Sequence, residues 1–257
     1  MGDIITKSET ADPIAIHVKG LSKTFQKRVV EQRSVRESIY GLFRNNTTEN
    51  FKVLDDINLQ IKKGETFGIV GRNGSGKSTL LLHILGALQG DKGSDIRVNG
   101  TILRLSLGMG VDPHLSARDN IYINGSILGL SFKQIGQRFG DIIEFAGIEE
   151  FVDTPVKKFS NGMKARLNFS VAIHTEADII LLDEFFGGVG DIDFREKSDL
   201  AFKEKIINNR TVVLVSHSMK LISDYCDRCI WLDKGKIMAM GKSEEIVDQY
   251  ESSFKSK

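Results

Sequence analysis

The chemistry-bearing residues that lie closest together form the run GRNGSGKST, residues 71–79. An apolar segment, 66–70, precedes this run as a strand would, and residues 80–85 follow it as a helix would. Glycines let successive backbone N–H groups turn into one concavity, and a helix start adds partial positive charge. This order therefore predicts a nucleoside triphosphate site rather than a flexible Gly/Ser loop. The residues predicted to bind the phosphates are Gly71, Asn73, Gly74, Ser75, Gly76, Lys77, Ser78 and Thr79.

Two carboxylates complete this site in the prediction. Asp183 and Glu184 directly follow the apolar run 179–182, and the end of a buried parallel strand lies at the same sheet edge as a phosphate loop. We expect Lys77 to reach the β- and γ-phosphates, while Ser78 and Asp183 hold Mg²⁺. Glu184 is then placed as the general base that polarises the attacking water.

Composition restricts the class of protein. The 257 residues are 40% apolar and 27% charged, and 35 Lys plus Arg against 34 Asp plus Glu leave a net charge of +1. This balance gives no basic surface for nucleic acid. The sequence shows no apolar run long enough to cross a bilayer and no signal-peptide pattern, so we expect a cytosolic protein that reaches a membrane only through a partner.

The two cysteines, Cys226 and Cys229, form a C-x-x-C pattern. A zinc site would need two more ligands of the same kind. We therefore favour packing of two small apolar side chains at a helix end over metal or redox chemistry.

The elements that must position these residues begin with strands. Residues 14–19 alternate as an edge strand would, and residues 54–61 repeat the pattern. Between them lies a polar insertion, 26–50, which is either a solvated loop or short helix or a docking surface for a membrane-embedded partner. The Asn-Gly pair at 99–100, flanked by apolar runs, predicts a hairpin of strands 96–98 and 101–103.

A helical insertion follows, from residue 115 to about 151, after an irregular segment at 104–114. Ser131 and Gln134 form a predicted capping box, and apolar residues then recur on one helix face.

The second half of the chain returns to strands. Residues 179–182 and 211–215 are continuous apolar runs, typical of parallel strands that are covered on both faces. An amphipathic helix at 194–208, a closing hairpin at 229–238 and a polar helix at 243–251 are also predicted.

One further motif, FSNGMKAR at residues 159–166, precedes a predicted helix with Ser160 as its N-cap. Its place upstream of the strand that ends in Asp-Glu resembles the signature sequence of the ATP-binding subunits of ABC transporters. It departs from that signature at three positions, with Phe, Asn and Met for Leu, Gly and Gln. The resemblance implies that these residues bind the γ-phosphate of ATP held by a second subunit: Ser160, Asn161, Gly162 and Met163.

The same resemblance assigns other positions. His217 matches the switch histidine at the γ-phosphate, and Phe25 matches the aromatic residue that stacks on adenine. Gly190 and Asp191 match the D-loop that contacts the other subunit. The family glutamine after the third strand is missing, since Ser106 or Leu107 would occupy its place.

Within the family, several stretches are similar to the exporters of lipid-linked bacterial polysaccharides such as O-antigen, capsule and teichoic acid. These stretches include GRNG at 71–74, RDNIY at 118–122, DTPV at 153–156, VGD at 189–191 and WLDKG at 231–235. Some members carry a C-terminal carbohydrate-binding domain, and we expect this chain to end too soon to hold one.

The resemblance implies an α/β fold: a RecA-like P-loop ABC nucleotide-binding domain with an antiparallel β portion and an inserted α-helical subdomain. We expect one ABC ATPase domain over 1–257, with the RecA-like core at about 14–111 and 173–240, the helical subdomain at about 112–172 and a polar helix at 241–257. Two copies of the chain would bind two ATP with Mg²⁺ and two copies of a membrane transporter subunit, at the cytoplasmic face of the bacterial inner membrane. ATP hydrolysis would power export of a lipid-linked glycan.

Three alternatives remain open at this point. One is an ABC ATPase for another transported substrate, and one is a soluble ABC-type ATPase that works on nucleic acid or ribosomes. The third is a non-hydrolysing scaffold that binds ATP to hold a complex together, which the missing glutamine favours and which Glu184 and His217 oppose.

Overall fold

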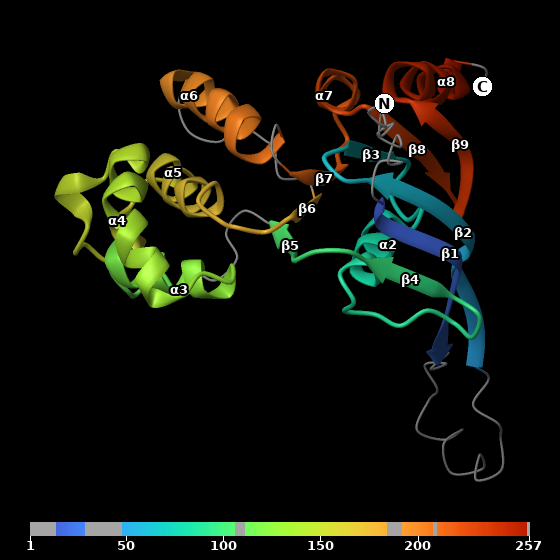
Figure 1. Ribbon diagram of the computed structural model, residues 1–257, viewed down its shortest axis with the longest axis horizontal. Helices are drawn as coiled ribbons and strands as arrows, with labels where there is room; N and C mark the ends of the chain where they lie inside the picture. The colour runs from blue at the N-terminus through green and yellow to red at the C-terminus, as the bar shows by residue number, and fades with distance from the viewer. Residues whose placement is uncertain (1–13, 29–47, 106–110, 184–191, 208–209, 256–257) are drawn as a thin grey trace, which may run out of the picture.

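The computed structural model describes residues 14–28, 48–105, 111–183, 192–207 and 210–255. Within these ranges the chain forms a six-stranded sheet, a three-stranded sheet and a group of helices that lies to one side of both (Figure 1). The predicted α/β class with an inserted helical segment is confirmed.

The six-stranded sheet has the order β5-β6-β7-β3-β8-β9. Neighbouring strands from β5 to β8 are parallel, and β9 alone pairs antiparallel, in the predicted hairpin with β8. Lys234 and Gly235 form its turn with positive φ values of 46° and 78°, which suits a two-residue hairpin. The strands are β3 (Thr66–Val70), β5 (Ile102–Leu105), β6 (Ile179–Asp183), β7 (Thr211–Val215), β8 (Arg228–Asp233) and β9 (Lys236–Lys242).

Helices cover both faces of this sheet, which explains why its central strands are apolar along their whole length. Ile179 and Leu181 of β6 belong to the core cluster that includes α2 (Lys77–Ile84). Ile180 and Leu182 point the opposite way, into a cluster built with α6 (Ile192–Phe202), α7 (Met219–Tyr225) and α8 (Ser243–Lys255). The sheet therefore has an α2 face and an opposite face, and alternate residues of each strand belong to each.

The C-terminal helix differs from its prediction as a polar helix. It runs from 243 to 255, between the predicted bounds of 243–251 and 241–257, and it buries Ile246, Val247 and Tyr250 against the sheet. Most residues of this helix are polar because its buried apolar stripe is narrow.

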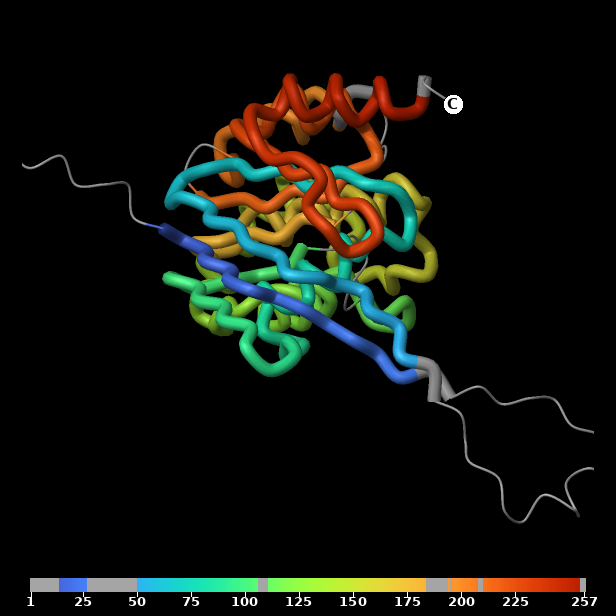
Figure 2. The backbone as a smooth tube through the Cα atoms, turned by 90° about the vertical axis from the view of Figure 1, so that its right-hand side faces the viewer, coloured from blue at the N-terminus to red at the C-terminus, as the bar shows by residue number. Residues whose placement is uncertain are grey.

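The three-stranded sheet has the order β2-β1-β4, with β1 (Ile14–Arg28) antiparallel to both β2 (Thr48–Lys62) and β4 (Asp95–Val98). Figure 2 shows β1 and β2 running side by side as one long pair. The prediction that residues 14–19 form an edge strand is wrong, because Ile16 and Val18 pair with β4 on one side and with β2 on the other. The alternation of apolar and polar residues indicates that one face of the strand is solvated. It does not indicate whether another strand pairs with each of its edges.

The predicted hairpin at Asn99-Gly100 is also wrong. Val98 ends a strand of one sheet and Ile102 begins a strand of the other. Long-range bonds direct the crossing, since Asn99 Nδ2 donates to the Ile14 carbonyl at 2.8 Å and the Thr101 amide donates to Asp178 Oδ2 at 2.8 Å. These contacts outweigh the local preference of Asn-Gly for a tight turn.

The helical insertion forms its own core cluster, with contributors from residue 111 to residue 171. The Ser131–Gln134 capping box is present, and a second box at Ser116 and Asp119 starts the preceding helix. The elements are α3 (Ala117–Ile127), α4 (Phe132–Ala146), the 3-10 turns Glu149–Phe151 and Val156–Lys158, and α5 (Asn161–Ala172).

Several predictions fall outside the described residues: Glu184, Gly190, Asp191, the missing glutamine at Ser106 or Leu107, and most of the insertion at 26–50. They stay predictions.

Candidate functional site

The parallel strands bring distant residues to one edge of the six-stranded sheet. Asp183 pairs with Val215 of β7, and Val215 pairs in turn with Ile69 of β3. The carboxyl ends of the three strands therefore lie level with one another. Residues 71–79 and His217 follow such ends, and Asp183 is the last residue of β6, at the edge where α/β sheets bind ligands.

The phosphate loop, residues 71–79, is held in shape by the end of β8 with the turn that follows it and by the middle of β2. A Cβ atom added to Gly71 would lie 2.2 Å from the Leu232 carbonyl oxygen, so only glycine fits there. Gly76 has φ 108°, and a Cβ on it would meet Val53 and Leu54 within about 3.0 Å. The Gly235 amide also donates to the Ser75 carbonyl at 2.9 Å. Backbone of two other elements thus sets the curvature of the loop.

Lys77 lies inside this loop with only 7% of its surface exposed. Its ammonium donates to the carbonyls of Gly71 at 2.8 Å and Arg72 at 3.0 Å, so the positive charge is directed across the concavity. Ser75 Oγ is also buried, and it has no hydrogen-bond partner among the described residues. A buried charge and a buried unsatisfied hydroxyl are costly in a folded protein unless something binds there.

The start of α2 adds to the positive potential. Within the described residues, no side chain caps the helix at Gly76 and its first turn carries no acidic residue. Its backbone N–H groups and dipole therefore favour a bound anion. Ser78 is exposed on the first turn. The curled loop and the buried Lys77 ammonium fit a nucleotide phosphate. The Ser78 hydroxyl and the Asp183 carboxylate are suitable oxygen ligands for a Mg²⁺ ion that accompanies this phosphate.

Asp183 does not stand alone at the end of β6. Arg104 of β5 donates from Nη2 to its Oδ2 at 2.8 Å, and the Asp183 side chain is 11% exposed. We did not predict Arg104 from the sequence. One feature of the sequence could have pointed to it: Arg104 is a charged residue between two apolar ones, Leu103 and Leu105, near the end of a strand.

His217 follows β7 at the same edge and is exposed to solvent. Phe25 lies on the far part of β1, where it pairs directly with Phe51 of β2; the two rings are 40% and 62% exposed. Directly paired residues of antiparallel strands have side chains on the same face. The Lys23 ammonium lies 5.3 Å from the Phe25 ring centroid.

The signature segment lies in the helical insertion, apart from the phosphate loop (Figure 1). Ser160 caps α5, as predicted, because its Oγ accepts from the Met163 amide at 3.1 Å. Ser160 and Asn161 are exposed, and Gly162 and Met163 are half-buried. The structure thus gathers 71–79, Asp183 and His217 at one edge and puts 160–163 on a different body of the chain.

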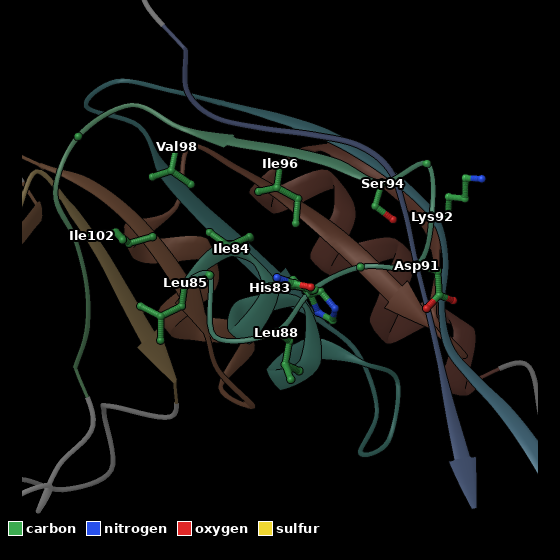
Figure 3. A pocket seen from close by; sticks show the side chains of 15 residues that line it. His83, Ile84, Leu85, Leu88, Asp91, Lys92, Ser94, Ile96, Val98 and Ile102 are labelled. Carbon is green, nitrogen blue, oxygen red and sulfur yellow. The ribbon is translucent and has the colours of Figure 1, made fainter.

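A hollow of about 610 Å³ lies at the opposite end of α2 from the phosphate loop, between that helix and β4 (Figure 3). His83 lines it, and its Nδ1 donates to the Thr79 carbonyl at 2.7 Å. The other lining residues include Ile84, Leu88, Asp91 and Ile96. This hollow is separate from the phosphate site.

No group of three or more His, Cys, Asp or Glu side chains among the described residues could hold a metal ion. No helix in the same part of the chain is both long and apolar enough to cross a membrane.

Comparison with known sequences gives related proteins. The ABC transporter family profile matches residues 54–187. The chain is 42% identical over 200 residues to the ABC transporter protein AbcA of Aeromonas salmonicida, covering 78% of this chain and 65% of that protein. It is 38% identical over 247 residues to the O-antigen export system ATP-binding protein RfbB of Myxococcus xanthus, covering 93% and 56%. It is also 36% identical over 240 residues to the teichoic acids export ATP-binding protein TagH of Lactococcus lactis, covering 93% and 51%. The chain thus spans about half to two thirds of these relatives.

Solved structures show the same fold. The ATP-binding subunit of an ABC transporter matches with a TM-score of 0.68 at 21% identity, over 92% of this chain and 93% of that one. The ATP-binding cassette MJ0796, solved as a dimer bound to ADP and Pi, matches with a TM-score of 0.64 at 22% identity, over 89% and 98%. The predicted RecA-like P-loop fold is confirmed.

Proposed function

The chain belongs to the ABC transporter family, and from this premise we propose that it is the ATP-hydrolysing subunit of an exporter of lipid-linked polysaccharide. The observation that carries the proposal is the shared sheet edge, where the loop that holds the buried Lys77 ammonium follows β3 and the Asp183 carboxylate ends the level strand β6. Relatives named for O-antigen and teichoic acid export support the choice of substrate class.

Each residue has a distinct task in this proposal. The phosphate-loop amides and Lys77 bind the β- and γ-phosphates, and the preformed loop orients them before any chemistry begins. Ser78 and Asp183 would hold Mg²⁺, which supplies positive charge on the phosphate oxygens. Glu184 takes a proton from the attacking water, and His217 contacts the γ-phosphate. Phe25 supports the adenine ring through its exposed face.

The second half of each site would come from another copy of the chain. Ser160 and Asn161 are exposed at a helix start, where N–H groups suit a phosphate on a partner. Two copies would enclose two ATP molecules, and hydrolysis would reopen the dimer as a ligand-driven population shift. Gly190 and Asp191 would contact the other copy.

The proposed assembly includes two copies of a membrane transporter subunit. The helical insertion, which has its own core, is suited to transmit dimer closure as one body. Through that subunit the protein would lie at the cytoplasmic face of the inner membrane.

The direct test compares ATPase activity and size-exclusion profiles of the wild-type protein and Glu184→Gln in ATP and Mg²⁺. We expect wild type to hydrolyse ATP and Glu184→Gln to lose activity while it accumulates as an ATP-dependent dimer. The matched control is Glu144→Gln, the same change at an exposed position of α4. If wild type binds ATP but never hydrolyses it, even with the membrane subunit present, the proposal fails and the scaffold alternative gains support.

The substrate class needs its own experiment. The chain and its membrane subunit would be reconstituted in vesicles with a fluorescent lipid-linked glycan, and ATP-dependent transfer across the bilayer measured. Glycan transfer in wild type and none in Glu184→Gln is the expected result. ATP hydrolysis that never moves a glycan would assign the chain to another transported substrate.

A further inference from the structure

Arg104 is a charged residue within the nucleotide edge of the sheet. It lies one residue before the end of β5, and its Nη2 lies 2.8 Å from Asp183 Oδ2. The two positions are 79 residues apart in sequence. The Asp183 side chain is 11% exposed and the Arg104 side chain is 30% exposed, so the pair is partly shielded from solvent.

Strand register explains the contact. Arg104 pairs directly with Leu181, and Asp183 lies two residues further along the same strand, on the same face. Leu181 belongs to the core cluster formed with α2, whereas Leu105 belongs to the cluster on the opposite face. Arg104 and Asp183 therefore both lie on the α2 face of the sheet. This is the face covered by the helix that follows the phosphate loop.

The arginine is incompletely satisfied by this pairing. Its Nε is buried and has no hydrogen-bond partner among the described residues, so Asp183 is the one acceptor found for the guanidinium there. A guanidinium is permanently charged and presents several donors in a rigid fork. Its contact with a carboxylate oxygen is of the charge-assisted kind, which is stronger than a neutral hydrogen bond.

We propose that Arg104 competes with Mg²⁺ for Asp183, and so sets how much Mg²⁺ the subunit needs in order to bind nucleotide. This inference rests on the proposed function, because it takes Asp183 as a ligand of the metal. Two cations repel each other when they share one carboxylate, so Mg²⁺ at Asp183 would weaken the contact of Arg104 with Oδ2. Arg104 is thus a positioning residue that acts through Asp183.

The test measures binding rather than turnover. Mg²⁺ is titrated into the full-length chain with an excess of a fluorescent, non-hydrolysable ATP analogue, and the half-saturating Mg²⁺ concentration is recorded. We expect Arg104→Gln to lower that concentration about tenfold, the factor that corresponds to one charge-assisted hydrogen bond. Binding of the analogue in EDTA should change less than threefold, because the arginine is not proposed to contact the nucleotide.

Three further variants sharpen the result. Arg104→Lys keeps a cation beside Asp183 and should stay within about threefold of wild type. Arg97→Gln is the matched control, since Arg97 is 70% exposed on β4 and pairs with Asp95. Arg104→Met keeps the apolar stem of the side chain and replaces Arg104→Gln if that variant does not fold. It should lower the half-saturating Mg²⁺ concentration by the same factor.

A second readout separates this role from a purely structural one. Removal of Arg104 leaves Asp183 largely buried without its cation, so the thermal midpoint in EDTA should fall. Mg²⁺ with the analogue should then raise the midpoint by more in Arg104→Gln than in wild type. A structural loss alone would lower both midpoints equally.

The outcomes distinguish the inference from the function on which it rests. An unchanged or higher half-saturating Mg²⁺ concentration in Arg104→Gln overturns the competition. Weaker binding in EDTA would overturn it as well, since Arg104 would then be a phosphate ligand. If the wild-type chain binds no analogue with or without Mg²⁺, the proposed function itself fails.

Discussion

The phosphate loop and the signature segment look alike in sequence but differ in structure. Both combine serine and glycine at the start of a helix, α2 in one case and α5 in the other. In the phosphate loop, Lys77 and Ser75 are buried and the curvature is imposed by backbone of β2 and the β8–β9 turn. In the signature segment, Ser160 satisfies its own helix by accepting from Met163, and it remains exposed.

This difference separates a site that is formed within one chain from a surface that completes another site. The loop holds the buried Lys77 charge, which its own carbonyls accept, and the buried Ser75 hydroxyl, which has no hydrogen-bond partner among the described residues and which a ligand would satisfy. The helix start at Ser160 is stable by itself and costs little to expose. Loss of the first should abolish binding, whereas loss of the second should spare binding and affect turnover.

The largest effect is expected for Lys77→Ala. Nucleotide affinity should fall about 100-fold, because a desolvated ammonium makes charge-assisted bonds to the phosphates. Equilibrium binding of a fluorescent ATP analogue measures this, and Lys92→Ala at an exposed loop position is the control. Binding that survives in Lys77→Ala would show that the loop does not act through its buried charge.

Next come two glycines of the same loop. Gly71→Ala should destabilise the fold by about 2–4 kcal/mol, since its Cβ would lie 2.2 Å from the Leu232 carbonyl oxygen. Gly74→Ala has nothing within 4 Å among the described residues, so only its positive φ of 77° costs energy, about 1 kcal/mol. Urea unfolding curves give both values. Equal losses would mean that the surrounding backbone does not shape the loop.

Ser160→Ala tests the other side of the comparison. The lost cap should cost about 1 kcal/mol, and the control Ser131→Ala should cost about the same, because each serine oxygen accepts from a first-turn amide of its helix. We expect ATPase activity to fall about tenfold or more only in Ser160→Ala, with analogue binding unchanged in both. A similar fall in Ser131→Ala would reduce the signature serine to a helix cap.

The smallest expected effect is that two cysteine thiols behind the phosphate loop do not react with a thiol reagent. Cys226 and Cys229 are buried against β3, the strand that leads into the loop. Burial raises the pKa of the Cys229 thiol to about 12 and raises that of Cys226 still further. At pH 8 roughly one Cys229 thiol in ten thousand is then ionised.

Ellman's reagent at pH 8 should therefore leave both thiols of the native protein unmodified while the guanidinium-unfolded protein reacts fully. Rapid reaction of the native protein would mean that the support behind the phosphate loop opens readily. That result would weaken the contrast between a rigid loop and an exposed helix start.

The sequence by itself determined what depends on neighbouring residues. Glycine spacing and the lysine in 71–79 specify a loop that curls before a helix, and serine three residues before glutamine specifies the start of α4. Continuous apolar runs specified β6 and β7 as strands that are covered on both faces. These features follow from local backbone geometry and burial, which a short window of sequence contains.

Only the tertiary structure decided which distant segments meet. It placed β1 between β2 and β4, separated Val98 and Ile102 into different sheets, and brought Arg104 to Asp183. Strand partners are chosen by competition among many long-range contacts, and no single window contains both members of a pair. An arginine near a strand end is an anomaly in the sequence, and it becomes interpretable only when the register shows which carboxylate lies diagonal to it.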